Sequence, residues 1–156
     1  MDFRKGFTLI EVILVIGLLL IIATFGLFFS FESFRGYSFH SDRDILVSLL
    51  QHVRSQAIGN TCRGSGCTDG KSQGIKIQND KFIMFQGNSF DDLSTDHSLD
   101  VIVSTNSNVS HSGQDEFVFT QLSGDVLDPG DVTLTDLSGK TSTISINSEG
   151  QVIWTN

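Results

Sequence analysis

Basic residues and prolines are scarce in this chain. Its 156 residues include 10 lysines and arginines against 18 aspartates and glutamates, which gives a formal net charge of −8. Because an acidic protein is repelled by phosphate groups, this balance argues against nucleic acid as a partner. The only proline is Pro129, so none interrupts the apolar N-terminal part of the chain.

The sequence also lacks the motifs of the common enzyme classes. Its four histidines show no metal-ligand spacing, and neither a glycine-rich phosphate loop nor a G-x-S-x-G elbow is present. We therefore predict that the protein is not an enzyme and that it needs no cofactor.

Three aspartates in the stretch DVLDPGD are weak calcium candidates: Asp125, Asp128 and Asp131. Calcium takes six to eight oxygen ligands, and clustered loop carboxylates supply some of them. Their spacing matches no defined calcium motif, so solvated turn residues are the favoured interpretation and no metal site is predicted.

Cysteine is rare, with only Cys62 and Cys67 in the stretch CRGSGC. A metal site would need two further ligands, and no histidine or cysteine stands at a suitable spacing nearby. If this part of the chain lies outside the cytoplasm, we expect the two cysteines to form a disulfide that closes a small loop. The alternative is a pair of free thiols.

The N-terminal part has almost no charge. Between Phe7 and Phe31 the only charged side chain is Glu11, and the apolar run 12–29 has 18 residues, the minimum for a membrane-spanning helix. Arg4 and Lys5 precede this run, and no basic residue follows before Arg35. The positive-inside rule therefore predicts a cytoplasmic N-terminus and an exported head.

Three interpretations account for this segment. A cleaved secretory signal needs a small-x-small site after the apolar run, which residues 27–37 (LFFSFESFRGY) do not provide. A simple signal anchor explains the length of the segment but not the presence of Glu11. Placing an acid deep in the bilayer costs roughly 3 kcal/mol. The third interpretation gives Glu11 a function and a cationic partner.

The stretch GFTLIEV, behind Arg4 and Lys5, resembles the class III signal sequence of type IV pilins and type II secretion pseudopilins. The resemblance implies that prepilin peptidase cleaves between Gly6 and Phe7, on the cytoplasmic side. Phe7 then becomes the N-methylated N-terminus, and Glu11 becomes the fifth residue of the mature chain. Many pilins carry a proline in the retained helix, and this chain does not.

Cleavage at this position would supply the missing cation. The new α-amino group on Phe7 has a reference pKa near 8, so it is largely cationic at neutral pH. In a bundle of such helices, we expect Glu11 of one subunit to pair with the Phe7 amine of a neighbour. Such a buried pair is poor evidence for stability but a reasonable device for fixing the register of subunits.

The rest of the chain predicts an amphipathic helix followed by strands. Apolar residues at three- and four-residue spacings indicate a helix over 42–58, capped by Ser41 and ended by Gly59 and Asn60. Short β-rich runs predict strands at 74–78, 81–86, 100–104, 116–120, 131–137, 141–147 and 151–154, and polar surface loops at 90–97 and 106–115. The predicted fold is α+β and pilin-like: a long N-terminal helix, membrane-spanning and then amphipathic, packed on antiparallel sheets.

A second resemblance concerns one branch of the family, the H-type minor pseudopilins and FimT-like minor pilins. It rests on Arg54 to Ala57 (RSQA), Phe117 to Gly124 (FVFTQLSG) and Ile144 to Val152 (ISINSEGQV). It implies a head of two small antiparallel sheets against the helix.

The sequence thus predicts three parts: a cleaved leader (1–6), an apolar transmembrane and assembly helix (7–31) and a globular head (32–156). We expect a structural minor pilin or pseudopilin, anchored in the bacterial inner membrane with a periplasmic head and then assembled into a pilus or pseudopilus. Its expected partners are other pilin or pseudopilin subunits, prepilin peptidase and, before assembly, membrane lipid. The alternatives are a DNA-binding minor pilin for transformation and an unprocessed, signal-anchored periplasmic domain.

Overall fold

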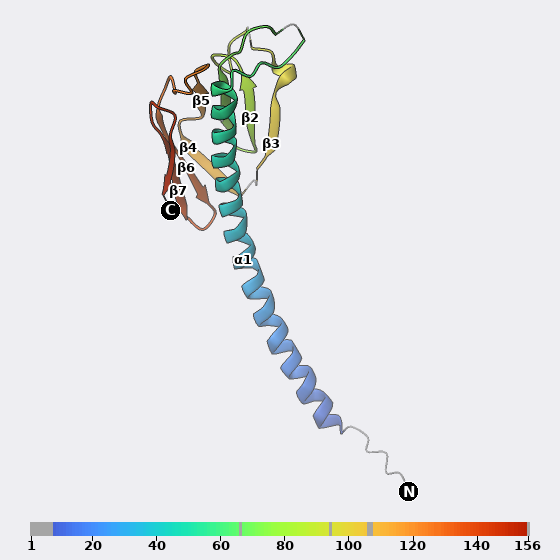
Figure 1. Cartoon of the computed structure of the whole chain (residues 1–156). Helices are drawn as coiled ribbons and strands as arrows, with labels where there is room; N and C mark the ends of the chain where they lie inside the picture. Colours follow the sequence, from blue (N-terminus) through green and yellow to red (C-terminus); the bar gives the residue numbers. More distant parts are fainter. Residues whose placement is uncertain (1–7, 66, 94, 106–107, 156) are drawn as a thin grey trace. The chain divides into compact units, whose positions relative to one another are not determined.

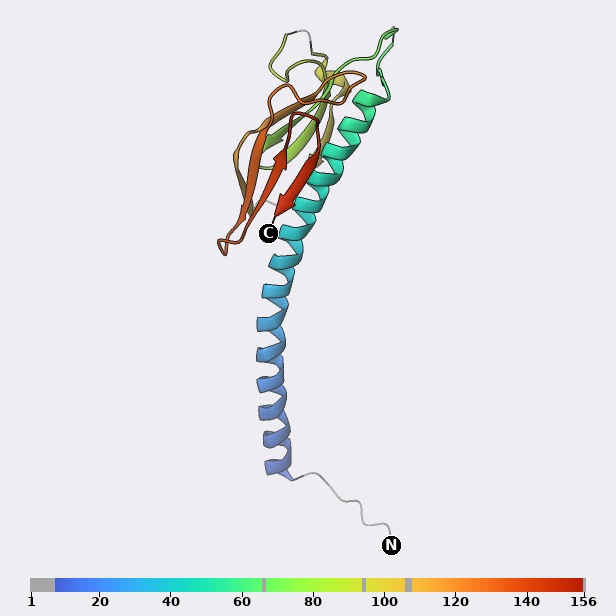
Figure 2. The ribbon, with the colours of Figure 1, turned by 60° about the vertical axis from the view of Figure 1, so that its left-hand side comes forward.

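The computed structural model describes residues 8–65, 67–93, 95–105 and 108–155, without the side chains of 27–36. Gly6 and Phe7, the two residues of the predicted cleavage site, lie outside the described residues. The chain divides into two compact units, Met1–Ser38 and Phe39–Asn156, and we call the second unit the head. The elements of the head are seen from two sides in Figures 1 and 2.

A single helix, α1 (Leu9–Ile58), runs through 50 residues. Ser41 lies within it, so the prediction of a helix start at Ser41 is wrong. No proline precedes Ser41 to break the helix, so the helix continues through Ser41 although serine is a residue type that suits an N-cap.

The predicted end of α1 is confirmed. The N–H of Thr61 donates to the carbonyl of Gln56 (3.0 Å) and the N–H of Asn60 to that of Ala57 (3.1 Å). Asn60 has the left-handed φ of 53°. This is the hydrogen-bond pattern of a Schellman motif, in which asparagine takes the position that glycine occupies most often.

Two four-stranded antiparallel sheets follow the helix, as the second resemblance implies. The first, sheet A, has the order β3-β2-β1-β5. Its strands are β1 (Gln73–Gln78), β2 (Lys81–Gln86), β3 (Val101–Ser104) and β5 (Glu116–Phe119). Strands β1 and β2 form a hairpin around Asn79 and Asp80, with Gln78 opposite Lys81. All four strands lie within a residue of their predicted bounds.

Sheet B has the order β4-β6-β7-β8. Its strands are β4 (Val109–Gly113), β6 (Gly130–Asp136), β7 (Thr141–Ile146) and β8 (Val152–Thr155). Strand β4 was predicted as part of a polar loop, and that prediction is wrong. Its sequence, VSHSG, places only Val109 in the core, so it shows no apolar alternation, yet it pairs with β6 along its length.

One hydrophobic core joins α1 to both sheets. In Figure 1, β2 and β3 lie to one side of the helix and β4, β6 and β7 to the other. The inward helix face carries Leu46, Leu50 and Ala57, all without exposed surface, and the sheets contribute residues such as Ile75 and Ile144, also fully buried. The α+β, pilin-like fold is therefore confirmed: each sheet buries one apolar face against the helix.

Sheet A also buries part of its outer face. Phe85 is fully buried but lies outside the main core, and its ring packs edge-on against Phe90, with 5.5 Å between ring centroids. Gly74, opposite Phe85 in the ladder, leaves room for that ring, since a side chain there would collide with it. The loop predicted at 90–97 as a polar surface excursion is thus anchored on the sheet by an aromatic residue.

Candidate functional site

The described chain begins with a helix cap built from Thr8 and Glu11. The backbone N–H of Thr8 donates to Glu11 Oε2 (3.3 Å), and the Thr8 hydroxyl lies 3.4 Å from the same oxygen. In return, the N–H of Glu11 donates to Thr8 Oγ1 (3.4 Å). This reciprocal arrangement is a capping box, which satisfies donors that would otherwise have no partner at the start of the helix.

The capping box gives Glu11 a role within its own chain that sequence reasoning missed. The signal was present, because Thr8-Leu9-Ile10-Glu11 has the spacing [ST]-x-x-[DE] just ahead of an apolar run. It places the carboxylate at the positive end of the helix dipole, where an acid is favoured. Glu11 thus lies in the first turn of α1, at the N-terminal end of the apolar segment.

Over residues 9–26 the helix surface is apolar, apart from Glu11, and is exposed on all sides. Residues 9–26 have a mean hydropathy of 2.8, and none of this window is buried. Large side chains such as Leu9 (78% exposed), Ile13 (61%) and Leu20 (62%) have no cover from the described residues. A helix of this length and composition is able to cross a membrane, or to pack against other helices of the same kind.

The residues behind the second resemblance meet at the end of α1. Arg54 Nη2 donates to the carbonyl of Glu149 (2.8 Å) and Arg54 Nε to that of Gly124 (3.4 Å). Ala57 is fully buried, and its carbonyl accepts from the N–H of Leu122 (2.9 Å). We call this set the Arg54 cluster; it ties two turns of the head to one helix.

The Arg54 cluster requires two glycines. Gly124 and Gly150 both have a φ of +71°, which favours residues without a Cβ. A side chain on Gly150 would also collide with the carbonyl of Gly124. Two turns far apart in the sequence therefore pack backbone to backbone beside the arginine.

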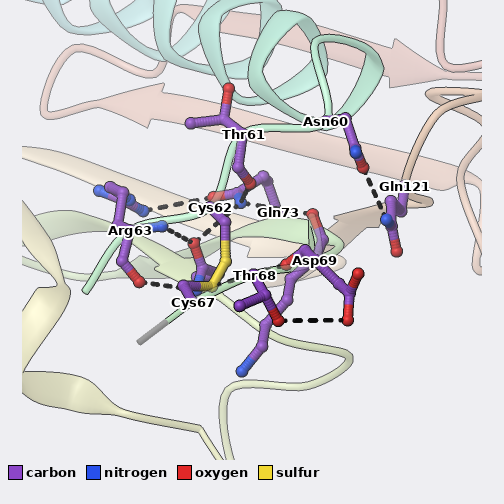
Figure 3. Close-up of a disulfide and its surroundings, with 11 residues drawn as sticks. Asn60, Thr61, Cys62, Arg63, Cys67, Thr68, Asp69, Gln73 and Gln121 are labelled. Atoms are coloured by element: carbon purple, nitrogen blue, oxygen red, sulfur yellow. Dashed lines mark hydrogen bonds between the residues drawn. A yellow bond between two sulfur atoms is a disulfide. The ribbon is translucent and has the colours of Figure 1, made fainter. Parts of the chain in front are cut away.

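Cys62 and Cys67 form a disulfide on the chain segment that follows α1 (Figure 3). The neighbouring strand ends carry Gln73, which is fully buried, and Gln86, which is 7% exposed. Gln73 Nε2 donates to the carbonyl of Thr61 (3.0 Å) and to Gln86 Oε1 (3.3 Å). Gln73 thus donates both to Gln86 and to the returning segment, and it holds that segment to sheet A. Sequence reasoning missed this network.

The three calcium candidates are not gathered into a metal site. Among the described residues, no group of three or more acidic, histidine or cysteine side chains could hold a metal ion. Backbone groups of this segment serve the fold instead: the carbonyl of Asp125 accepts from Thr120 N (2.7 Å) and that of Asp131 from Gln114 N (2.9 Å). The carbonyl of Asp128 accepts from Gln114 Nε2 (2.7 Å).

One ion-pair cluster lies on sheet A. Lys76 Nζ is 3.1 Å from Asp115 Oδ2 and 3.5 Å from Glu116 Oε2. Burial alone would lower the pKa of Lys76, but the hydrogen bond and charge of Asp115, with Glu116, outweigh it and raise this pKa above its ordinary value. The lysine is thus a charged structural residue, unsuited to accept a proton at neutral pH.

Comparisons with known proteins identify the N-terminal segment. Residues 1–27 match the model of the prokaryotic N-terminal methylation motif. A search of curated proteins and a search of solved structures found no match. The motif supports a type IV pilin-like or pseudopilin subunit, which is a structural protein and not an enzyme, and it implies processing by prepilin peptidase and assembly with other pilins. Together with the apolar helix, it is consistent with a membrane-anchored protein.

Proposed function

We propose that this chain is a minor pilin or pseudopilin subunit, of the H-type or FimT-like branch, in a type IV pilus or a type II secretion pseudopilus. It waits in the inner membrane with its head in the periplasm and then enters the filament through its N-terminal helix. The observation that carries the proposal is an acid in the first turn of a bare apolar helix, inside a methylation motif.

Processing provides the chemistry for assembly. Cleavage between Gly6 and Phe7 leaves a cationic primary amine one residue before Thr8, close to the start of α1, and a separate methyl transfer then N-methylates it. In the membrane, the capping box satisfies the Glu11 carboxylate within its own chain. In the filament, the Phe7 amine of a neighbour pairs with it in a medium of low dielectric constant, where a misplaced charge would be left unpaired.

In this proposal the ion pair sets the axial register of the subunits, and the apolar surface of α1 supplies the contacts between their helices. Removing one partner of a buried ion pair leaves the other uncompensated, which costs about 3–5 kcal/mol. Only one axial position of the subunit avoids that penalty. The exposed leucine and isoleucine side chains of α1 then exchange lipid for neighbouring helices in whatever register the charges allow.

Glu11→Ala tests this account of assembly. We expect the variant to insert and to be processed normally but to be lost from the sheared filament fraction, as measured by immunoblots of membrane and filament fractions. Thr24→Ala is the matched control, because Thr24 lies in the same apolar helix and its hydroxyl donates within that helix, to Ile21 O (2.8 Å) and Leu20 O (3.1 Å). Normal incorporation of Glu11→Ala would refute the pairing.

A further inference from the structure

A polar hollow of about 420 Å³ lies between the segment after α1 and the short helix η1 (His97–Leu99). Its size falls in the usual range of small-ligand sites. Its lining comes from the disulfide loop and the residues after it, from the end of β2, and from η1 with its cap, including Arg63, Thr68, Asp69, Lys71, Gln86 and Asp96. Neither the assembly helix nor the Arg54 cluster contributes to it.

The first wall of the hollow is held in place by the buried glutamines. Arg63 N donates to Gln86 Oε1 (2.8 Å), and Gln86 Nε2 donates back to Arg63 O (3.4 Å). The Arg63 guanidinium also bonds Gln73 Oε1 (3.3 Å). Figure 3 shows Arg63 and Gln73 beside the disulfide. A loop fixed through both backbone and side chain pays little entropy on binding.

The second wall is fixed independently. Asp96 caps η1, since its Oδ1 accepts from Ser98 N (3.0 Å) and Ser98 Oγ (2.6 Å). These hydrogen bonds keep the pKa of Asp96 below its ordinary value. His97 is braced on one side by Asp100 (2.8 Å between Nδ1 and Oδ2) and on the other by the Phe90 ring (4.7 Å between centroids).

The two walls meet at Gly64. Its φ is +103°, and a Cβ there would lie 3.1 Å from Leu99 Cδ1. The glycine thus allows the disulfide loop to approach η1 closely, leaving the hollow beside the contact. Leu99 is the one large apolar side chain of the lining.

The lining restricts what such a hollow could hold. The lining carries two cations, Arg63 and Lys71, and two carboxylates, Asp69 and Asp96, so a ligand with a strong net charge of either sign meets repulsion from two of these groups. A largely apolar ligand would leave these groups without hydrogen bonds. A neutral molecule with many hydroxyl groups donates to the carboxylates and accepts from the cations and the hydroxyls.

We propose that this hollow binds a neutral, polyhydroxylated ligand, that is, a carbohydrate. Arg63, Gln86 and Asp96 are held by hydrogen bonds within the protein, and the donors and acceptors of the lining match an array of sugar hydroxyls. This role is separate from assembly, because none of its residues belongs to α1.

The test is binding of the full chain to a printed array of neutral oligosaccharides, including maltohexaose and chitohexaose, and of acidic ones, including hyaluronan hexasaccharide. The protein is kept in a zwitterionic detergent, since a glycosidic detergent would compete. We expect binding to at least one neutral glycan, weakened about tenfold or more by Asp96→Asn and by Lys71→Ala, because each removes a charged hydrogen-bond partner.

Asp96→Asn keeps a good capping residue, so its loop is expected to stay folded. Lys140→Ala, in the β6–β7 turn and outside the hollow, is the matched control and should bind like the parent chain. Binding to no neutral glycan, preference for acidic glycans, or equal binding by Asp96→Asn and Lys71→Ala would each overturn the proposal.

Discussion

At the scale of single residues, Glu11 has one partner within its own chain and a second in the filament that we propose. Its own Thr8 holds the carboxylate through two donors at 3.3 and 3.4 Å. Helix caps of this kind contribute about 0.5–2 kcal/mol, much less than the penalty for an unpaired buried charge. A cap of this strength orders the first turn, and in the proposed filament we expect it to yield to a neighbouring amine.

Arg54 shows how one side chain joins distant segments of the head. We expect Arg54→Ala to lower the free energy of unfolding by about 1–2 kcal/mol, because two carbonyls lose a charged donor. The measurement is urea unfolding of the full chain in detergent, followed by the fluorescence of Trp154, the only tryptophan, which lies on β8.

Arg54→Lys is the matched variant. It keeps the charge but cannot reach both carbonyls with a planar fork, so it should lie between Ala and the parent chain. Equal unfolding curves for Arg54→Ala and the parent would show that the two turns hold together without the arginine.

At the scale of elements, the strands that could be predicted were those with a local pattern of apolar residues. Strands were expected at 131–137 and 141–147 from short β-rich runs, and β6 and β7 were found within a residue of these bounds. Strand β4 was missed because its partner, β6, is more than fifteen residues away and its own residues are mostly polar. Edge strands of this kind are specified by backbone pairing, which leaves little trace in side-chain pattern.

The buried amides were missed for a related reason. Gln73 and Gln86 stand at strand ends, where a polar residue usually faces water. They become buried only because the segment after α1 folds back over them, and that return is decided by contacts distant in sequence. The capping box at Thr8 differs, since its signal was local and readable.

The disulfide is the element that restrains this returning segment. We expect Cys62→Ser with Cys67→Ser to destabilise the head by about 2 kcal/mol, the entropy of closing a loop this short, while α1 and the sheets keep their structure. The measurement is urea unfolding of the full chain, with circular dichroism for secondary structure.

Gly139→Ala calibrates that comparison. Gly139 has a φ of +82° and no neighbour within 4 Å, so this variant shows the loss of stability that backbone strain in one turn produces by itself. If the double serine variant unfolds like the parent chain, the Gln73–Gln86 network alone is sufficient to hold the segment.

At the scale of the whole molecule, the two units present surfaces suited to different surroundings. The window Leu9–Gly26 exposes apolar side chains throughout, more than a monomer in water tolerates, so it requires lipid or other helices. The head, in contrast, buries a hydrophobic core of its own. In the proposed function, cleavage at the N-terminus prepares the apolar helix to leave the lipid and pack against the helices of other subunits.

The most direct test of the central claim is the intact mass of the chain purified from bacterial membranes, with fragmentation of its N-terminus. The account predicts a chain that has lost Met1–Gly6, begins at Phe7 and carries one added methyl group. A chain still beginning at Met1, recovered from cells with an active prepilin peptidase, would contradict it.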